Sequence, residues 1–191
     1  GDIWIMATAE DAVPRRLTLH EAYESRPVFN ADGNYLAFTG NRFGHDDIFR
    51  ISVKGGNPER LTFHQAADEI TDWDERNQIW FSTVRNYKQV EWDSEIHLLD
   101  LDNPTPYRAM DALGEQAVVS PNGRYVAFVK GACRFTRENY SGPADNEIWI
   151  YDREKENYFA FTDNEVNDLL PRWRNDQELF YLSALDGRYA V

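Results

Sequence analysis

One phrase recurs four times along this chain of 191 residues, and it constrains the fold more than any other feature. Each copy places a polar turn before a short apolar strand that ends on an aromatic residue, at Phe38, Phe81, Phe128 and Tyr181. These aromatic residues follow one another at intervals of 43, 47 and 53 residues. A period of about 40 to 50 residues built only from strand and turn signals is typical of a β-propeller, whose blades are four-stranded antiparallel sheets.

The first complete repeat shows the four strands of a predicted blade, which we call strands a to d. Strand a, at 27–29, ends at a turn in which Asp32-Gly33 favours a tight hairpin. Strand b is expected at 35–39, and strand c at 47–53 alternates apolar and polar residues. Strand d follows a second tight turn at 60–63. The chain is therefore expected to be all-β.

Applied along the chain, this pattern predicts one propeller domain of residues 1–191, with three complete blades and half a blade at each end. The predicted boundaries are about 27–63, 70–110 and 116–161 for the complete blades, and 2–18 and 170–191 for the half blades. The two halves either pair to close a four-bladed ring or belong to a larger ring. Four blades is the small end of the range for propellers, so we expect a segment of a larger, incomplete ring.

Composition excludes several classes of partner. The chain carries 33 acidic and 20 basic residues, for a formal charge of -13, so it should be repelled by nucleic acid and by anionic membranes. No apolar run approaches the roughly 18 residues that a membrane-spanning helix needs, so no membrane insertion is expected. The single cysteine, Cys133, excludes an internal disulfide but leaves the compartment open.

The sequence contains no pattern that predicts catalysis, a cofactor or a metal site. A phosphate-binding loop, paired zinc cysteines and a Gly-x-Ser-x-Gly elbow are all absent from it. His20 and His64 occupy equivalent places after strand d, which favours a structural role. An acidic residue opens every strand c and is expected to make a structural hydrogen bond rather than to bind calcium, at Asp2, Asp47, Glu95 and Glu147. Five tryptophans are expected in the core, namely Trp4, Trp73, Trp80, Trp149 and Trp173.

The loops between strands b and c and between strands d and a should share one face of the disc, because neighbouring strands alternate in direction. We call this the loop face. Its loops are longer than the turns on the other face, and loops carry binding more often than strands do. The candidate binding residues there are Arg42, Arg85, Trp92, Arg134, Arg137 and Tyr140. The arginines suit a peptide carboxylate or an acidic partner; the alternative is that they only offset nearby acids. The longest of these loops, 130–146, is expected to be ordered.

These repeats resemble those of the TolB and tricorn type, which place a leucine-threonine pair, a short loop and a proline-aspartate-glycine turn before an apolar strand. The matching residues are Arg16-Leu17-Thr18, Arg60-Leu61-Thr62 and Ser120-Pro121-Asn122-Gly123. The turns at 74–77 and 174–177 depart from the pattern because they lack the proline and glycine. Residues 130–144 and 146–152 are similar to the first propeller of tricorn-like serine peptidases.

The resemblance implies a non-catalytic propeller portion of a tricorn-like serine peptidase that gates or binds peptides or partner domains. In that family the catalytic serine and its base lie in a later region, to which nothing here corresponds. The partner would be a peptide, a protein or the catalytic domain of the same parent chain. The alternatives are a TolB-like periplasmic scaffold with no attached enzyme, and a propeller fused to an α/β-hydrolase peptidase. The family favours a periplasmic or secreted location over the cytoplasm.

Overall fold

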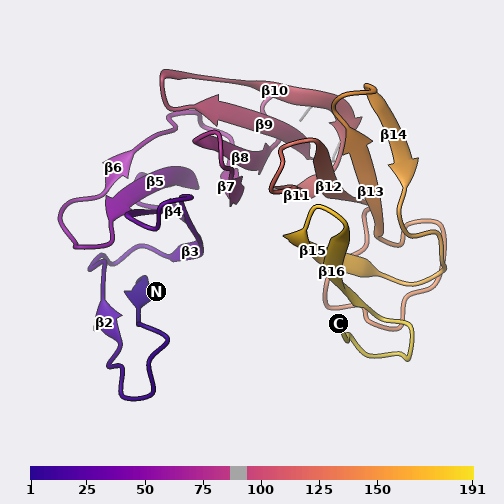
Figure 1. The fold of residues 1–191 in the computed structure, drawn as a ribbon, viewed down its shortest axis with the longest axis horizontal. Coiled ribbons are helices and arrows are strands. Elements are labelled where there is room, and N and C mark those ends of the chain that lie inside the picture. The colour runs from indigo at the N-terminus through magenta and orange to yellow at the C-terminus, as the bar shows by residue number, and fades with distance from the viewer. Residues whose placement is uncertain (87–93) are drawn as a thin grey trace.

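The computed structural model describes residues 1–86 and 94–191, and the regular secondary structure within those ranges consists of β-strands alone. The strands form three four-stranded antiparallel sheets and two two-stranded sheets. Figure 1 shows the sheets side by side in an arc around an open centre, with the two termini on either side of the opening. Within the described part of the chain, no helix is long and apolar enough to cross a membrane.

Each four-stranded sheet is one blade, and its strands follow one another in sequence order. The first blade contains β3 (Glu24–Phe29), β4 (Tyr35–Gly40), β5 (Asp47–Ser52) and β6 (Glu59–Arg60). The second contains β7 (Asp68–Trp73), β8 (Gln78–Thr83), β9 (Glu95–Asp100) and β10 (Asn103–Leu113). The third contains β11 (Glu115–Val119), β12 (Tyr125–Lys130), β13 (Glu147–Asp152) and β14 (Asn157–Ala160). The half blades are β1 (Trp4–Ile5) with β2 (Arg15–Arg16), and β15 (Asp168–Asn175) with β16 (Glu178–Ser183).

The predicted fold class, three complete blades with half a blade at each end, is confirmed. Strand a begins earlier than the pattern indicated, at Glu24 in β3, Asp68 in β7 and Asp168 in β15. The cause is a bulge within strand a, seen as a register shift between Ser25 and Val28 in β3. A bulge interrupts the apolar and polar alternation by which a strand is recognised. The boundaries of the domain itself stay a prediction.

The a–b turns form even where the sequence departs from the proline-glycine pattern. In the regular first turn the Asn30 side chain accepts a hydrogen bond from the Tyr35 N–H at 2.9 Å. In the second, Asp74 accepts from the Gln78 N–H at the same distance. Asn77 there adopts a φ of 61°, the left-handed conformation that Gly33 supplies in the first turn. Asparagine tolerates this conformation better than most residues, so glycine is not required.

The core lies between successive sheets. Ile48 of the first blade and Phe81 of the second belong to one buried cluster, and Trp80 of the second blade packs with Phe128 of the third in another. Burial of such side chains stabilises the fold by roughly 25 cal/mol per Å² of apolar surface. The prediction that Trp4 lies in the core is wrong, because its side chain is 58% exposed. It lies in a two-stranded half blade that presents one face to solvent.

Candidate functional site

The loop face is organised around the junctions between successive blades. We number them from one to four: the N-terminal half blade to the first blade, the first to the second, the second to the third, and the third to the C-terminal half blade. At three junctions a threonine two residues after strand d accepts a hydrogen bond, at 2.9 Å, from the backbone N–H of the residue that follows the acid of strand c. These pairs are Thr18 with Ile3, Thr62 with Ile48, and Thr162 with Ile148.

The next element of each junction is a turn that leads into strand a. The side chains of His20 and His64 accept hydrogen bonds from the backbone N–H two residues further on, both at 3.0 Å. Asn164 does the same at the fourth junction, at 2.9 Å. Since an asparagine replaces histidine in the same geometry, the structural role expected for the two histidines is confirmed.

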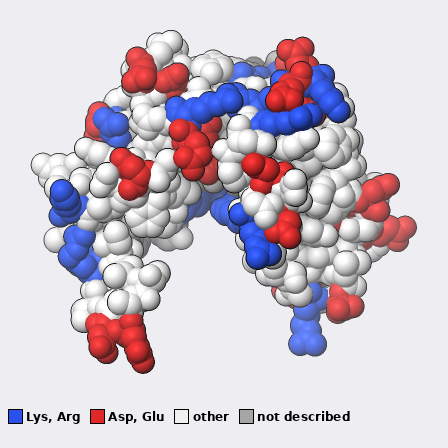
Figure 2. Space-filling view, viewed as in Figure 1, with Lys and Arg blue, Asp and Glu red and all other residues white. Residues whose placement is uncertain are grey.

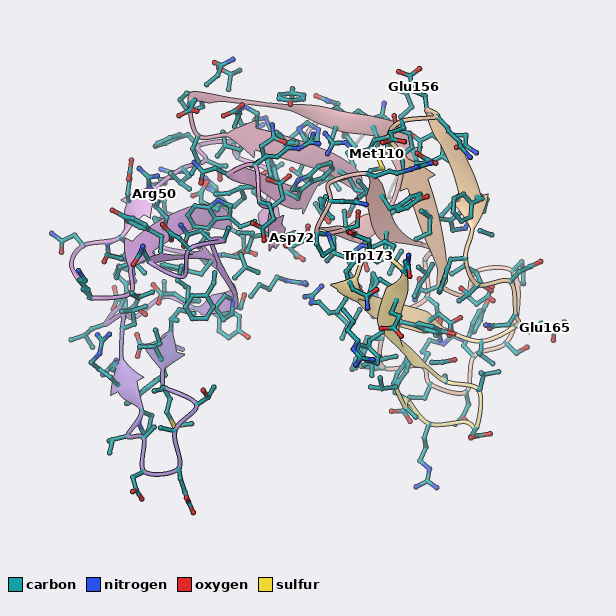
Figure 3. All side chains as sticks on the ribbon, in the orientation of Figure 1. Arg50, Asp72, Met110, Glu156, Glu165 and Trp173 are labelled. Carbon is teal, nitrogen blue, oxygen red and sulfur yellow. The ribbon has the colours of Figure 1, made fainter. Side chains whose placement is uncertain are left out.

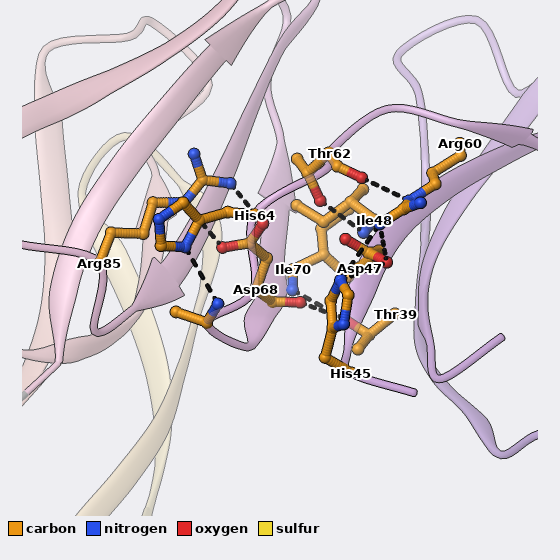
Figure 4. A network of polar contacts seen from close by, with 11 residues as sticks. Thr39, His45, Asp47, Ile48, Arg60, Thr62, His64, Asp68, Ile70 and Arg85 are labelled. Atoms are coloured by element: carbon orange, nitrogen blue, oxygen red, sulfur yellow. Dashed lines mark hydrogen bonds and ion pairs between the residues drawn. The ribbon is translucent and has the colours of Figure 1, made fainter. Parts of the chain in front are cut away.

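Buried carboxylates at the second junction are paired with arginines (Figure 4). The fully buried Asp47 lies 2.8 Å from the Arg60 guanidinium and 3.5 Å from the His45 ring. Asp68, also fully buried, accepts a hydrogen bond from Arg85 Nε at 3.0 Å. Burial raises the pKa of Asp47 above its usual value although Arg60 opposes the shift. Each pair lies within one blade, that of Asp47 in the first and that of Asp68 in the second, and removing one partner would leave a buried charge without compensation.

The first junction repeats the arrangement. Arg16 pairs with Asp2, and the Nε atom of Arg42 donates to the buried Glu24 at 2.8 Å. The side chains of Arg42 and Arg85 are only 14% and 12% exposed. Two of the candidate binding residues therefore already have carboxylate partners within their own blade, and a binding role for them stays a prediction.

The loop 130–146 of the third blade has a different environment. Its backbone is tied to two buried asparagines: Asn146 donates to the Cys133 carbonyl at 2.7 Å, and Asn167 donates to the Arg137 carbonyl at 2.9 Å. Phe135 at its tip stacks on Tyr189, with ring centroids 4.9 Å apart. The loop is thus ordered, as expected, and its contacts reach the C-terminal half blade.

Two candidate residues of this loop, Arg134 and Arg137, are exposed to solvent, and the third, Tyr140, is half-buried. The Arg137 guanidinium lies 4.5 Å from the centroid of the Tyr140 ring. Arg134 is exposed, and its guanidinium has no carboxylate partner among residues 1–86 and 94–191. Trp92, the remaining candidate, lies outside the described residues. The structure thus brings Arg134, Arg137 and Tyr140 onto one loop, away from the structural pairs of Arg42 and Arg85.

A cavity of about 440 Å³ lies beside this loop, between the second and third blades. Lys130, Cys133 and Arg134 form its loop wall, and Glu115 and Leu113 lie on the opposite side. Its size is within the range of about 300 to 1,000 Å³ that ligand pockets occupy. The two cations and one acid suit an anionic or zwitterionic group, such as a peptide terminus. Among the described residues no group of three or more His, Cys, Asp and Glu side chains is placed to hold a metal ion.

Sequence reasoning missed a second feature, at the inner edge of the arc. Arg26, Gln116 and Leu170 occupy the same position of strand a and have φ values of 54°, 57° and 53°. With Arg172 and Ile70 they line a central cavity of about 170 Å³. Figure 2 shows Lys and Arg side chains along this inner wall. The signal that was available is the proline that follows Arg26 and Leu170, because proline removes a donor from the sheet.

Asp72 stands at the same inner edge (Figure 3). Its Oδ2 accepts a hydrogen bond from the Val119 N–H of the third blade at 2.7 Å. Burial raises the pKa of this carboxyl to about 6, although the Val119 and Trp73 N–H groups and the Arg172 charge all oppose the shift. Asp72 thus links two blades through a group that titrates near neutral pH.

Comparison with known proteins identifies the same architecture. Residues 1–191 match the family described as the tricorn protease N-terminal β-propeller domain. An uncharacterised protein of Agrobacterium fabrum is 25% identical over 138 residues, which cover 68% of this chain and 47% of that protein. A solved structure assigned as TolB, from Agrobacterium tumefaciens, has a TM-score of 0.73 at 18% identity over 94% of this chain. TolB from Acinetobacter baumannii has a TM-score of 0.67 at 16% identity over 98%. The chain spans 62% and 50% of those two structures.

Proposed function

Because the chain belongs to the tricorn protease N-terminal β-propeller domain family, we propose that it is the non-catalytic propeller portion of a tricorn-like serine peptidase. Its task is to bind or gate peptides, or to hold the catalytic domain of its parent chain, through the loop face. The proposal extends beyond the solved relatives, whose similarity concerns the fold alone, and the chain covers 62% and 50% of the length of the two TolB structures.

The observation that carries the proposal is the contrast between two sets of arginines. Arg42 and Arg85 are committed to buried carboxylates, whereas Arg134 lines an open cavity with no carboxylate partner among the described residues. A guanidinium that is free of internal partners retains its hydrogen-bond donors for a ligand, and it matches a carboxylate in geometry. Arg137 and Tyr140 on the same loop add a second cation and an aromatic surface.

The test is a double variant, Arg134→Ala with Arg137→Ala, in the full-length parent protein. We expect stability to change by less than about 1 kcal/mol, as for ordinary surface substitutions, while the KM for peptides or the affinity for a protein partner worsens. The matched control is Lys54→Ala with Lys155→Ala, which removes two exposed cations from the c–d turns on the opposite face. Equal losses in both double variants would mean that overall charge, and not the loop, is responsible.

A different outcome distinguishes the alternative function. If the full-length protein has no peptidase activity and the loop variant loses only a protein partner, the propeller is a TolB-like scaffold. If the loop variant unfolds while the control variant does not, loop 130–146 is a structural brace and the binding role is wrong.

A further inference from the structure

The fourth junction keeps the acidic residues of its counterparts but lacks both arginines. Asp47 and Glu147 are the first residues of strand c at the second and fourth junctions, and Asp2 takes the same place at the first junction, two residues before β1. Strand a begins there with Asp168, as it does with Glu24 and Asp68 at the other two. We propose that this junction binds a divalent cation of the Ca²⁺ class between Glu147 and Asp168, where the first and second junctions use two guanidinium groups.

Strand register defines the equivalent positions. Arg16 lies opposite Trp4 and Arg60 opposite Phe49, each two residues after the acid of strand c. The residue at the same place, opposite Trp149, is Ala160. The second arginine follows strand b. It comes two residues after the strand-b residue that pairs with the acid at the start of strand a. That position is Arg42 at the first junction, Arg85 at the second and Leu185 at the fourth. Both compensating cations have therefore been replaced by uncharged side chains.

The two carboxylates lie beside each other because one residue contacts both. The Asn164 N–H donates to Glu147 Oε1 at 2.8 Å, and the Asn164 side-chain amide donates to Asp168 Oδ2 at 2.7 Å. Neither carboxylate forms an ion pair with a described residue. Asp168 is fully buried, and its Oδ1 atom has no hydrogen-bond partner. A buried carboxylate oxygen without a partner destabilises the folded state, and a cation bound to the Asp168 oxygen would remove that destabilisation.

The aromatic residue of strand b also differs at the fourth junction. Tyr181 occupies the place of Phe38 and Phe81, whose rings lie beneath the guanidinium groups of Arg42 and Arg85. A phenol oxygen thus stands where the other junctions have only a ring edge.

The donors determine the class of cation. Glu147, Asp168 and Tyr181 supply oxygen ligands, which hard cations such as Ca²⁺ and Mg²⁺ prefer, and Ca²⁺ tolerates the more irregular geometry. Two carboxylates balance one divalent ion, just as they balance two arginines at the first and second junctions. A small ion also reaches the buried Asp168 oxygen more readily than a partner's side chain does. The remaining ligands would be water or backbone carbonyls, since two carboxylates alone do not complete a Ca²⁺ site.

The experiment is a calorimetric titration of the chelator-treated protein with CaCl₂. The wild type should bind Ca²⁺ in one saturable step. Glu147→Gln with Asp168→Asn should weaken that step at least about tenfold, because ligand charge sets Ca²⁺ affinity. The control is Asp163→Asn with Glu165→Gln, which removes two exposed acids from the adjoining loop and should bind as the wild type does.

A second variant restores the arginine of the other junctions. Ala160 is exposed and has room for a longer side chain, so Ala160→Arg should place a guanidinium beside Glu147 and reduce Ca²⁺ binding while the protein stays folded. This variant decides the question if the double acid variant does not fold. The proposal is wrong if the wild type shows no saturable step, if the acid variant binds equally well, or if Ala160→Arg binds Ca²⁺ unchanged.

Discussion

Arg85 and Arg134 lie on the same face of the propeller in opposite surroundings. Arg85 donates to the fully buried Asp68 from two nitrogens, whereas Arg134 is exposed beside a cavity. Substitution of Arg85 by alanine leaves a buried carboxylate unpaired, so we expect a loss of about 3 to 5 kcal/mol in the free energy of unfolding. Arg134→Ala should cost less than about 1 kcal/mol. Urea unfolding of both variants checks this, and similar losses would mean that Arg134 is structural as well.

Asp72 predicts a dependence of stability on pH. Its pKa is raised from 3.8 to about 6 in the folded protein, so between those values the folded state binds more protons than the unfolded state. The contribution of the protonated carboxyl to the free energy of unfolding therefore has its full value below about pH 4, and it is lost as the pH rises through about 6. Asp72→Asn stays neutral and can still accept from the Val119 N–H.

The variant should thus exceed the wild type in stability at pH 7.5, by on the order of 1 to 3 kcal/mol, and match it near pH 4. Thermal unfolding across this range measures the difference. A constant gap between variant and wild type at all pH values would show that Asp72 does not titrate in this window.

At the scale of elements, glycine fixes the base of loop 130–146. Gly131 has a φ of 148°, and a Cβ atom there would lie 2.2 Å from the Asp145 carbonyl oxygen. Gly44, in the corresponding loop of the first blade, has a φ of 90° and nothing within 4 Å of its Cβ position. Gly44→Ala should therefore cause only backbone strain, on the order of 1 to 2 kcal/mol. Gly131→Ala should in addition push away the chain segment at Asp145, on the other side of the loop.

We expect faster proteolysis and faster amide exchange across 130–146 in Gly131→Ala, and no such local change in Gly44→Ala. If the two variants behave alike, the close approach to Asp145 is not what holds the loop. The result bears on the proposed function, because this loop carries Arg134 and Arg137.

At the scale of the whole molecule, the repeat alone predicted the architecture. Phe38, Phe81 and Phe128 lie in equivalent strands and are all fully buried. The spacing of these aromatic residues in the sequence therefore equals the spacing of the blades. The structural role of Asp47 at the start of strand c also followed from recurrence, whereas the cation proposed at Glu147 departs from the structural role that recurrence predicted for it. These features repeat within the chain, and repetition is visible without coordinates.

What the sequence could not reveal depends on register and on contacts between blades. The inner bulges give Arg26, Gln116 and Leu170 their positive φ values, yet no common residue type marks that position. The partners of Arg42 and Arg85 lie 18 and 17 residues away in sequence, across one sheet. The missing arginines at Ala160 and Leu185 became recognisable only when strand pairing had aligned the junctions.

The central claim is that this propeller serves a serine peptidase without supplying its chemistry. The most direct test is to label the full-length parent protein with a fluorophosphonate, which reacts with activated serines, and to locate the modified residue by peptide mapping. The account predicts one labelled serine outside residues 1–191, with peptide hydrolysis abolished by the label. Labelling of a serine within residues 1–191, or peptide hydrolysis that persists in the fully labelled protein, would contradict it.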